Sequence, residues 1–257
     1  MCRQQAIGFF DSGLGGLSLL AAAVRQFPNE RFIYLGDSAN APYGTRTADE
    51  VIRLSLDAVS LLDSRGIKAL VVACNTATGA AISALRERYT FPIIGLEPAL
   101  KPAADEWQGG LILVMATPVT LHSAKFNALF ERFGQHAQKL PCPGLMDFVE
   151  REEFQSAALD NYLDLLFAPY HNERISAVVL GCTHYLFLRE QIKARLPAGT
   201  RIFDSNRGVT RQLGRRLAEA DLLALPGSTG AVEFITTADS EKAAQMQRVY
   251  SVAQRLF

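Results

Sequence analysis

The chain has 257 residues, of which 49% are hydrophobic and 20% are charged, and its 26 Lys and Arg balance its 26 Asp and Glu. This length and apolar content predict a globular protein with a sizeable core, built as one large domain or two small ones. The zero net charge excludes a strongly basic protein, so we expect neither a nucleic-acid partner nor a membrane partner. No apolar run is long enough to span a membrane, and we expect no signal peptide.

The chain contains four cysteines, Cys2, Cys74, Cys142 and Cys182. None of them forms a Cys-x-x-Cys pair, and a chain with this much core does not need disulfide bonds for stability. We therefore expect a cytoplasmic protein whose thiols are available for chemistry.

The first part of the chain alternates short apolar runs with helical patterns. The predicted strands are Ala6–Phe10, Arg31–Leu35, the run that starts at Ala69 and ends before Cys74, and Pro92–Gly95. Three helices are predicted in this part. The first follows Gly16 and ends near Gln26, the second runs from a cap at Thr47 to Arg65, and the third runs from Ala77 to about Tyr89. Glu50 completes a capping box with Thr47, and the Pro and Gly of residues 40–44 indicate a loop.

The same alternation then begins again. The predicted strands are Gly110–Met115, His136–Leu140, Ala177–Leu180, Arg201–Phe203 and Val232–Ile235. The predicted helices are about Pro118–Phe133, Phe154–Phe167, Tyr185–Leu196, Gly208–Ala218 and a last helix from Asp239, with a turn at residues 141–144.

Alternating strands and helices predict the α/β class with mainly parallel sheets. Two such series predict two similar α/β halves, with the active site in the cleft between them. We place residues 97–206 in the second half, and residues 1–96 together with 207–257 in the first. The chain would then cross between the halves twice.

Two cysteines follow directly on apolar strands that correspond to each other in the two series. Cys74 follows Ala69–Ala73, and Cys182 follows Ala177–Gly181. Apolar runs of this kind are typical of strands buried on both faces. Because ligands of open α/β sheets bind outside the carboxyl ends of the strands, both thiols are expected where chemistry takes place. Cys2 and Cys142 have no such counterparts, and we assign them no role.

If the two halves face each other, the two thiols would approach one ligand from opposite sides. One thiolate would remove a proton from carbon while the other thiol delivers a proton to the opposite face. This inverts a stereocentre without a cofactor. Free cysteine has a pKa of about 8.5, so a modest shift supplies thiolate near neutral pH.

The residues next to the cysteines are suited to assist. Asp11 and His184 are ionisable groups at strand ends, and each could relay protons or bias the charge of a thiol. Hydrogen-bonding side chains and helix N-termini could hold the carboxylates and amino group of an amino acid. These side chains are Ser12, Asn75, Thr76 and Thr183.

Other interpretations stay open from the residues alone. A buried cysteine at a strand end is often a small apolar filler. A cysteine hydrolase could use Cys182 with a histidine and Asp11, but it would leave Cys74 unexplained. A metal site is not favoured, because Cys74, Cys182 and His184 lack the paired spacing that metal ligands usually have. A pyridoxal phosphate enzyme is not favoured either, because no lysine directly follows a predicted strand. A non-enzymatic amino-acid-binding module is the remaining class.

The glycine-rich turn at residues 11–16, Asp-Ser-Gly-Leu-Gly-Gly, lacks the complete G-x-G-x-x-G dinucleotide fingerprint. It could bind a phosphate or a carboxylate at the helix N-terminus that follows. It could equally be a tight connection from strand to helix.

Five motifs in this chain resemble those of the glutamate racemase family, within the aspartate/glutamate racemase superfamily. They occur in the family's order and span nearly the whole chain. The motifs are Phe10–Gly16, Gly36–Ala39, Pro42–Gly44, Cys74–Thr76 and Gly181–Tyr185.

The resemblance implies an enzyme without a cofactor that interconverts L- and D-glutamate and supplies D-glutamate for peptidoglycan. It implies that Cys74 deprotonates D-glutamate and Cys182 deprotonates L-glutamate, with help from Asp11 and His184. It also implies a set of substrate contacts: Asp11, Ser12, Tyr43, Gly44, Asn75, Thr76, Thr183 and His184. Thr117 and Thr120 are weaker candidates, because their segment matches the family only loosely.

His184 also bears on the substrate within this resemblance. Aspartate-specific relatives tend to carry an acidic residue at this place, so histidine favours glutamate over aspartate or a related acid. Asp147 departs from the family, where proline is common, which affects the shape of the loop and not the chemistry. The resemblance leaves open a homodimer, activation by a cell-wall precursor and a role connected with gyrase.

Overall fold

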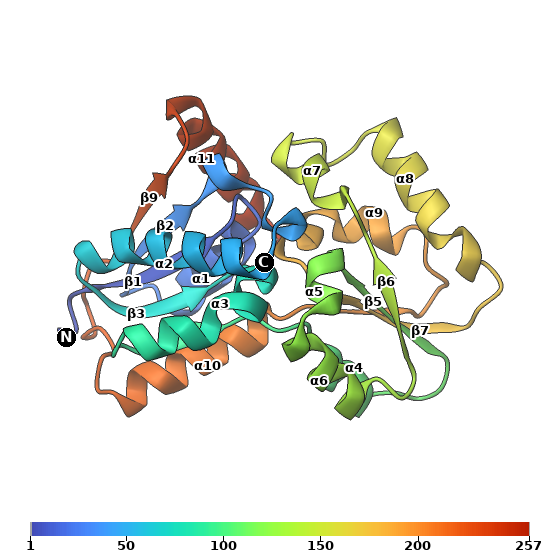
Figure 1. Ribbon diagram of the computed structural model, residues 1–257, viewed down its shortest axis with the longest axis horizontal. Helices are drawn as coiled ribbons and strands as arrows, with labels where there is room; N and C mark the ends of the chain where they lie inside the picture. Colours follow the sequence, from blue (N-terminus) through green and yellow to red (C-terminus); the bar gives the residue numbers. More distant parts are fainter. Residues whose placement is uncertain (1, 257) are drawn as a thin grey trace. The chain divides into compact units, whose positions relative to one another are not determined.

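The computed structural model describes residues 2–256, which form two sheets flanked by helices (Figure 1). The strands of sheet one are β1 (Ala6–Asp11), β2 (Arg31–Gly36), β3 (Ile67–Val72), β4 (Ile93–Gly95) and β9 (Ala231–Thr236). The strands of sheet two are β5 (Leu111–Ala116), β6 (Ala137–Pro141), β7 (Ile175–Leu180) and β8 (Arg201–Phe203). Every pairing between these strands is parallel, which confirms the predicted α/β class with two parallel sheets.

The chain packs into two compact units. Unit 1 contains the described residues up to Leu96 and those from Asn206 onward, and it carries sheet one. Unit 2 is Glu97–Ser205 and carries sheet two. Asn206 was expected in the second half, but it packs in unit 1 because it is the first residue of helix α10 (Asn206–Glu219).

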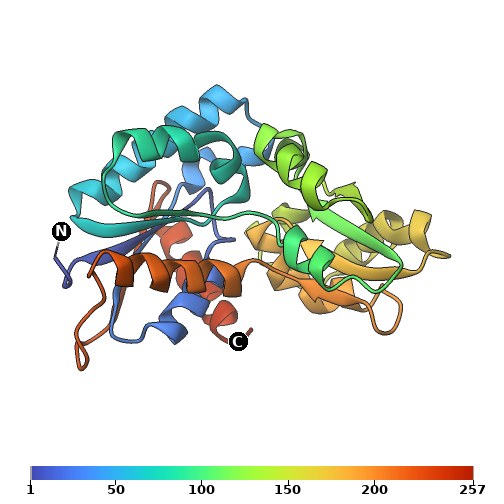
Figure 2. The same ribbon diagram turned by 90° about the horizontal axis from the view of Figure 1, so that it is seen from below.

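Helices cover both faces of sheet one. Helices α2 (Ala48–Ser64) and α3 (Asn75–Arg88) pack together on one face (Figure 2). Helices α1 (Leu17–Gln26), α10 and α11 (Ser240–Gln254) pack together on the other. Since both faces are covered, every residue of β1 and β3 is buried, including the charged Asp11 and Lys68.

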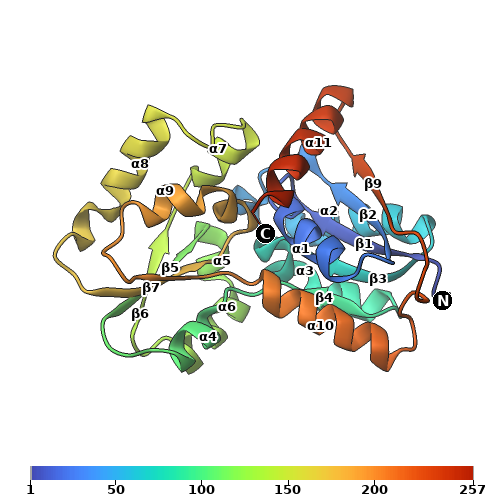
Figure 3. The same cartoon turned by 180° about the vertical axis from the view of Figure 1, so that it is seen from behind.

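The helices of unit 2 form two groups on either side of sheet two (Figure 3). One group contains α4 (Leu100–Asp105), α5 (Pro118–His122) and α6 (Ala124–Phe133). The other contains α7 (Leu145–Glu150), α8 (Ala157–Phe167) and α9 (Arg189–Lys193). Four short 3₁₀ segments complete the elements of the described chain: Ser38–Asn40, Tyr43–Thr45, Ala168–Tyr170 and Thr183–Leu188.

The two sheets repeat one design. The order β4-β3-β1-β2 in sheet one matches the order β8-β7-β5-β6 in sheet two. The register shifts between Ala6 and Ile7 where β1 meets β3, and it shifts again between Leu111 and Ile112 where β5 meets β7. A shared irregularity at corresponding positions supports an internal duplication, to which sheet one adds β9 as a fifth strand.

Two predicted helices are wrong in detail. The helix predicted over 118–133 is two helices, because Ser123 has extended backbone angles (φ −62°, ψ 142°) and its side chain caps α6. The helix predicted over 185–196 begins as the 3₁₀ segment and becomes α-helical only at Arg189. The short helices α4 and α7 were not predicted. Helix α7 follows the expected turn at Gly144, whose φ of 75° suits glycine.

The predicted start of α2 is confirmed, whereas that of α8 is shifted. Thr47 caps α2, and Glu50 completes the capping box. Helix α8 begins at Ala157, three residues later than predicted, because Ser156 caps it.

A buried ion pair ties together separate parts of unit 1. Lys68 on β3 is 0% exposed, and its Nζ lies 2.5 Å from Oε2 of Glu30, which is 3% exposed. Nζ also donates to the carbonyl of Arg3 at 2.6 Å, and Oε1 of Glu30 accepts from the N–H of Ala224 at 2.7 Å. The pair therefore joins the start of the chain, the segment before β2, strand β3 and the segment before β9.

Lys68→Met should destabilise the protein by about 3–5 kcal/mol, because it leaves the Glu30 carboxylate buried and unpaired. The double variant with Glu30→Gln should recover most of this loss, since the amide oxygen still accepts from Ala224. Urea-induced unfolding measures both values. Lys101→Met is the control, because Lys101 pairs with Asp105 on the surface and should contribute less than about 1 kcal/mol. Equal losses in Lys68→Met and Lys101→Met would contradict the prediction.

Candidate active site

The carboxyl ends of β1, β2 and β3 lie side by side and are followed by Ser12, Asp37 and Cys74. The N–H of Ala73 donates to the carbonyl of Phe10 at 2.7 Å, which extends the pairing of β3 with β1 to the residue before the cysteine. The N–H of Asp37 donates to the carbonyl of Asp11 at 2.9 Å. These bonds gather the predicted residues of unit 1 at one sheet edge, as expected for parallel strands.

Cys74 caps the N-terminus of α3. Its Sγ accepts from the N–H of Ala77 at 3.4 Å and lies 3.5 Å from Oγ of Ser12. A helix N-terminus and a donated N–H both favour negative charge on the sulfur. Cys74 is 6% exposed and also packs in the apolar core of unit 1, so its sulfur has polar neighbours at the edge of that core.

Asn75 and Thr76 lie in the first turn of α3, because the helix starts two residues earlier than predicted. Asn75 is only 6% exposed, and its Nδ2 has no hydrogen-bond partner within the described chain. A buried donor without an acceptor is costly, so this amide is suited to an acceptor on a ligand, such as a carboxylate.

Tyr43 and Gly44 lie in a loop that the sequence analysis placed at residues 40–44. The hydroxyl of Tyr43 donates to Oδ2 of Asp37 at 2.6 Å, and both residues are buried. Burial raises the pKa of Tyr43, and the Asp37 carboxylate raises this pKa further. The charges of Cys74 and Asp11 act in the same direction, so Tyr43, Cys74 and Asp11 belong to one cluster.

The glycine-rich turn is a tight connection between strand and helix. Within the turn, the N–H of Gly13 donates to Oδ1 of Asp11 at 2.9 Å, and the carbonyl of Gly13 accepts from the hydroxyl of Tyr34 at 2.8 Å. A Cβ at Gly16 would come within 2.8 Å of the Cβ of Asp11 and 2.9 Å of that of Ala73, so only glycine allows this approach. The turn holds Asp11 in place.

Unit 2 repeats this arrangement of strand ends. The N–H of Gly181 donates to the carbonyl of Met115 at 2.7 Å, and the N–H of Cys142 donates to the carbonyl of Ala116 at 3.0 Å. Cys182 therefore corresponds to Cys74 in the hydrogen-bond pattern. Cys142 has a counterpart after all, because it occupies the place that Asp37 occupies in unit 1.

Cys182 is the first member of a chain of three side chains. Its Sγ lies 3.6 Å from Nδ1 of His184, and Nε2 of His184 lies 2.9 Å from Oε1 of Glu150. Burial favours the neutral imidazole, but hydrogen bonds to the Cys182 sulfur and the Glu150 carboxylate outweigh it. The pKa of His184 is therefore well above its ordinary value of 6.5. The raised pKa favours the charged imidazole, which lies between the Cys182 sulfur and the Glu150 carboxylate.

The remaining predicted residues of unit 2 lie near the same strand ends. Thr183 begins the 3₁₀ segment after Cys182 and is buried. Thr117 follows β5 as Ser12 follows β1, and its Oγ1 donates to Oγ1 of Thr120 at 3.0 Å. Thr117 caps α5 and so has a structural role as well.

Two residues of the site, Asp37 and Glu150, were not predicted from the sequence. Asp37 was named within a motif, but its bond to Tyr43 was not foreseen. Glu150 lies in α7, a helix that was not predicted, and no sequence signal links it to His184.

Cys142 is buried, and its sulfur donates to the carbonyl of Leu140 at 3.3 Å. Burial raises the pKa of the Cys142 thiol, so this thiol is not suited to act as a base.

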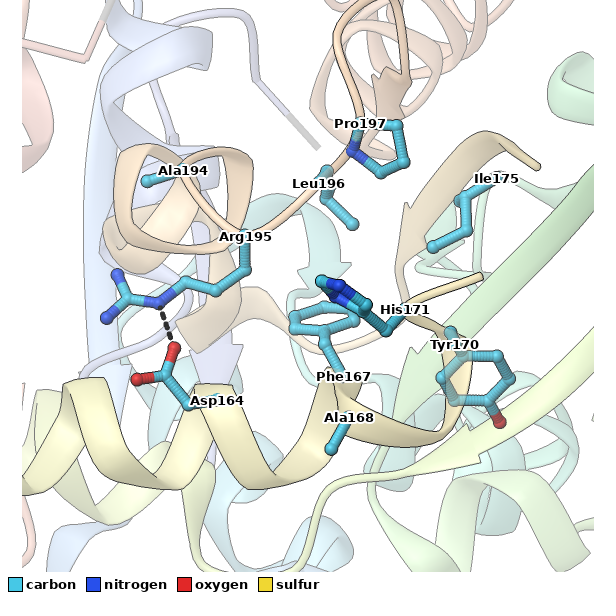
Figure 4. A pocket seen from close by; sticks show the side chains of 10 residues that line it. All are labelled: Asp164, Phe167, Ala168, Tyr170, His171, Ile175, Ala194, Arg195, Leu196 and Pro197. Atoms are coloured by element: carbon cyan, nitrogen blue, oxygen red, sulfur yellow. Dashed lines mark hydrogen bonds and ion pairs between the residues drawn. The ribbon is translucent and has the colours of Figure 1, made fainter. Parts of the chain in front are cut away.

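A pocket of about 830 Å³ lies elsewhere in unit 2 (Figure 4). It contains Ile175, the first residue of β7, whereas Cys182 follows the other end of that strand. Arg195 in this pocket is paired with Asp164 at 2.9 Å and with Asp160 at 2.6 Å. None of the predicted site residues lines it. Within residues 2–256, no group of three or more His, Cys, Asp or Glu side chains could hold a metal ion.

Comparisons with known proteins give the same family as the motifs. Residues 12–213 match the family model described as Asp/Glu/Hydantoin racemase. The chain is 47% identical to the glutamate racemase of Clostridium novyi (strain NT) over 239 residues, which cover 92% of each protein. The chain belongs to the Asp/Glu/hydantoin racemase family.

Solved structures support this assignment. The structure of Escherichia coli glutamate racemase in complex with L-glutamate and the activator UDP-MurNAc-Ala matches with a TM-score of 0.86 and 28% identity, covering 97% of this chain and 95% of that one. The glutamate racemase isoform RacE1 of Bacillus anthracis matches with a TM-score of 0.84 and 32% identity, covering 93% and 91%. Among the described residues, no helix is both long and apolar enough to cross a bilayer.

Glu150→Gln should lower the pKa of His184, because the amide oxygen can still accept from Nε2 but carries no charge. Titration of the imidazole by NMR measures this pKa. Glu153→Gln is the matched control, since Glu153 pairs with Arg151 on the surface. An unchanged pKa of His184 in Glu150→Gln would contradict the interaction.

The interaction between Glu150 and His184 should also change the free energy of unfolding in a pH-dependent way. The folded protein binds the His184 proton more tightly than the unfolded chain does, so the stabilisation is complete below the unfolded pKa of about 6.5. This stabilisation is lost as the pH rises through the raised pKa that His184 has in the folded protein. The difference in unfolding free energy between the wild type and Glu150→Gln should therefore be largest between about pH 5 and 6.5 and shrink at higher pH.

Proposed function

We propose that this protein is a glutamate racemase that interconverts L- and D-glutamate by proton transfer between Cys74 and Cys182, without a cofactor. The observation that carries the proposal is the duplicated strand end, which bears a cysteine in each unit with polar partners around its sulfur. The identity to glutamate racemases over most of the chain supports the substrate.

The two directions use the thiols in opposite roles. With L-glutamate, the Cys182 thiolate takes the α-proton, and the Cys74 thiol gives its proton to the opposite face of the carbanion. The products are D-glutamate, a Cys182 thiol and a Cys74 thiolate. With D-glutamate, each step runs in reverse, so protons and charges balance in both directions. This mechanism requires that both half-sites contact the same glutamate molecule.

Neighbouring side chains would assist these steps. The His184 imidazolium would stabilise the Cys182 thiolate, and Glu150 would hold the imidazole in position. Ser12 would form a hydrogen bond with the Cys74 sulfur, and Asp11, which is an acid, would assist by exchanging a proton. The free Nδ2 of Asn75 and the N-terminus of α3 would bind a carboxylate of glutamate. The substrate would also contact Tyr43, Gly44, Thr76, Thr183 and His184.

No electron sink is required if the site itself lowers the barrier to proton removal. Fixed hydrogen bonds to the substrate carboxylate, removal of water and correct alignment of the sulfur atoms would contribute to this. We further infer that the product D-glutamate is used in peptidoglycan synthesis, in the cytoplasm.

L-Glutamate incubated with the purified protein alone should lose its optical rotation completely, because the two enantiomers have equal free energy. Polarimetry follows this loss, and in heavy water the product enantiomer should carry deuterium at its α-carbon. L-Aspartate is the control substrate and should react much more slowly. A requirement for pyridoxal phosphate, or product without deuterium, would contradict the proposal.

Cys74→Ala and Cys182→Ala should each slow racemisation about 100- to 10,000-fold, the usual contribution of a general acid or base. Since the enantiomers are equal in free energy, kcat/KM must fall equally in both directions. The separate roles are seen in exchange of the α-proton with heavy water, measured by NMR. Cys74→Ala should retain exchange only of L-glutamate, and Cys182→Ala only of D-glutamate.

Cys2→Ala is the control for these variants, because Cys2 is an exposed cysteine outside the site, and its kinetics should match the wild type. Exchange of both enantiomers in either active-site variant would show that the missing thiol is not a base.

A further inference from the structure

The carboxylate of Asp37 organises the loop that carries Tyr43. Oδ2 accepts from the Tyr43 hydroxyl at 2.6 Å, and Nδ2 of Asn40 donates to both oxygens at 3.0 and 3.1 Å. A third donor comes from the far end of the chain. Oγ1 of Thr237 donates to Oδ1 of Asp37 at 2.7 Å.

Thr237 reaches Asp37 because of the fifth strand. β9 pairs with β2 in parallel, with Thr236 opposite Gly36, so the next residues of the two strands are neighbours. The N–H of Thr237 donates to the carbonyl of Gly36 at 3.3 Å. Within residues 2–256, sheet two has no strand that corresponds to β9, so in the described chain this contact is found only in the half that carries Cys74.

The Thr237 hydroxyl has a second bond to the same loop. Oγ1 accepts from the N–H of Ala39 at 3.1 Å while it donates to Asp37. One hydroxyl thus joins the carboxylate to the backbone of the Ser38–Asn40 turn. Gly44 follows this turn and lies next to Tyr43 in the second 3₁₀ segment.

The Asp37 carboxylate depends on these neutral donors. It is buried, and none of the ion pairs within the described chain includes it. A buried carboxylate needs hydrogen bonds to each oxygen to remain in a fixed orientation. Thr237 and Tyr43 bond to different oxygens, so loss of the Thr237 hydroxyl allows the carboxylate to turn and move Tyr43.

We propose that Thr237 is a positioning residue for substrate binding, which holds the loop of Tyr43 and Gly44 in place through Asp37 and Ala39. The proposal rests on the proposed function, in which this loop contacts glutamate. A contact made equally in the ground state and the transition state affects KM and leaves kcat nearly unchanged. Thr237 should therefore act mainly on KM, for both enantiomers.

Thr237→Val keeps the shape of the side chain and removes the hydroxyl. We expect KM to rise about three- to tenfold for L- and D-glutamate, a moderate change because Thr237 is exposed and water can partly replace the hydroxyl. Thr237→Ser keeps the hydroxyl and should restore a KM close to the wild-type value. Thr236→Val is the matched control, because Oγ1 of Thr236 accepts from Ala238 and does not bond to Asp37.

A double-variant cycle tests whether Thr237 acts through Tyr43. Thr237→Val should add little to the KM of Tyr43→Phe, since the bond that it supports is already absent. Full additivity of the two changes would overturn the proposal. So would an unchanged KM in Thr237→Val, or an equal rise in Thr237→Ser or Thr236→Val.

Hydrogen–deuterium exchange separates this proposal from the proposed function. The amides of residues 38–46 should exchange faster in Thr237→Val than in the wild type, Thr237→Ser or Thr236→Val. This result is expected even if the wild type does not racemise glutamate, in which case only the function has failed. Unchanged exchange in an active enzyme would overturn the role of Thr237 and leave the function intact.

Discussion

Both candidate bases owe their positions to the same backbone hydrogen bond. In unit 1 it joins Ala73 to Phe10, and in unit 2 it joins Gly181 to Met115, each at 2.7 Å. The bond extends the pairing of a central strand with its neighbour by one residue beyond the strand. The next residue is a cysteine in both units, so its side chain projects at the sheet edge where parallel α/β sheets place ligands. Without this backbone bond, neither cysteine would be held beside the polar side chains at its sheet edge.

The two units keep this backbone bond but surround the sulfur differently. Cys74 meets a hydroxyl and a helix N–H, both of which are neutral groups. Cys182 meets an imidazole that is itself bonded to a carboxylate. A duplicated frame has therefore acquired two electrostatic environments. The two sulfur atoms therefore differ in the charges around them although the backbone positions them alike.

The sequence alone predicts the fold class and most of the candidate site, because buried strands and glycine-rich turns have strong local signals. Asp11 is the last residue of such a strand, and Cys74 and Cys182 each lie two residues after the end of one. The partners of these residues have no local signal. Glu150 reaches His184 through tertiary packing, and Thr237 reaches Asp37 through pairing of distant strands. Helix interruption at Ser123 was also missed, because its side chain caps a helix inside one continuous amphipathic pattern.

The return of the chain from unit 2 to unit 1 has a consequence for biosynthesis. Unit 2 is a continuous segment, whereas sheet one receives β9, and α1 receives its neighbours α10 and α11, only from residues after 205. Domains fold as units while the ribosome elongates the chain. Unit 2 can therefore fold during translation, but unit 1 must wait with an open sheet edge beside β2. A nascent chain therefore completes its first half only after β9, α10 and α11 have been made, later than the whole of unit 2.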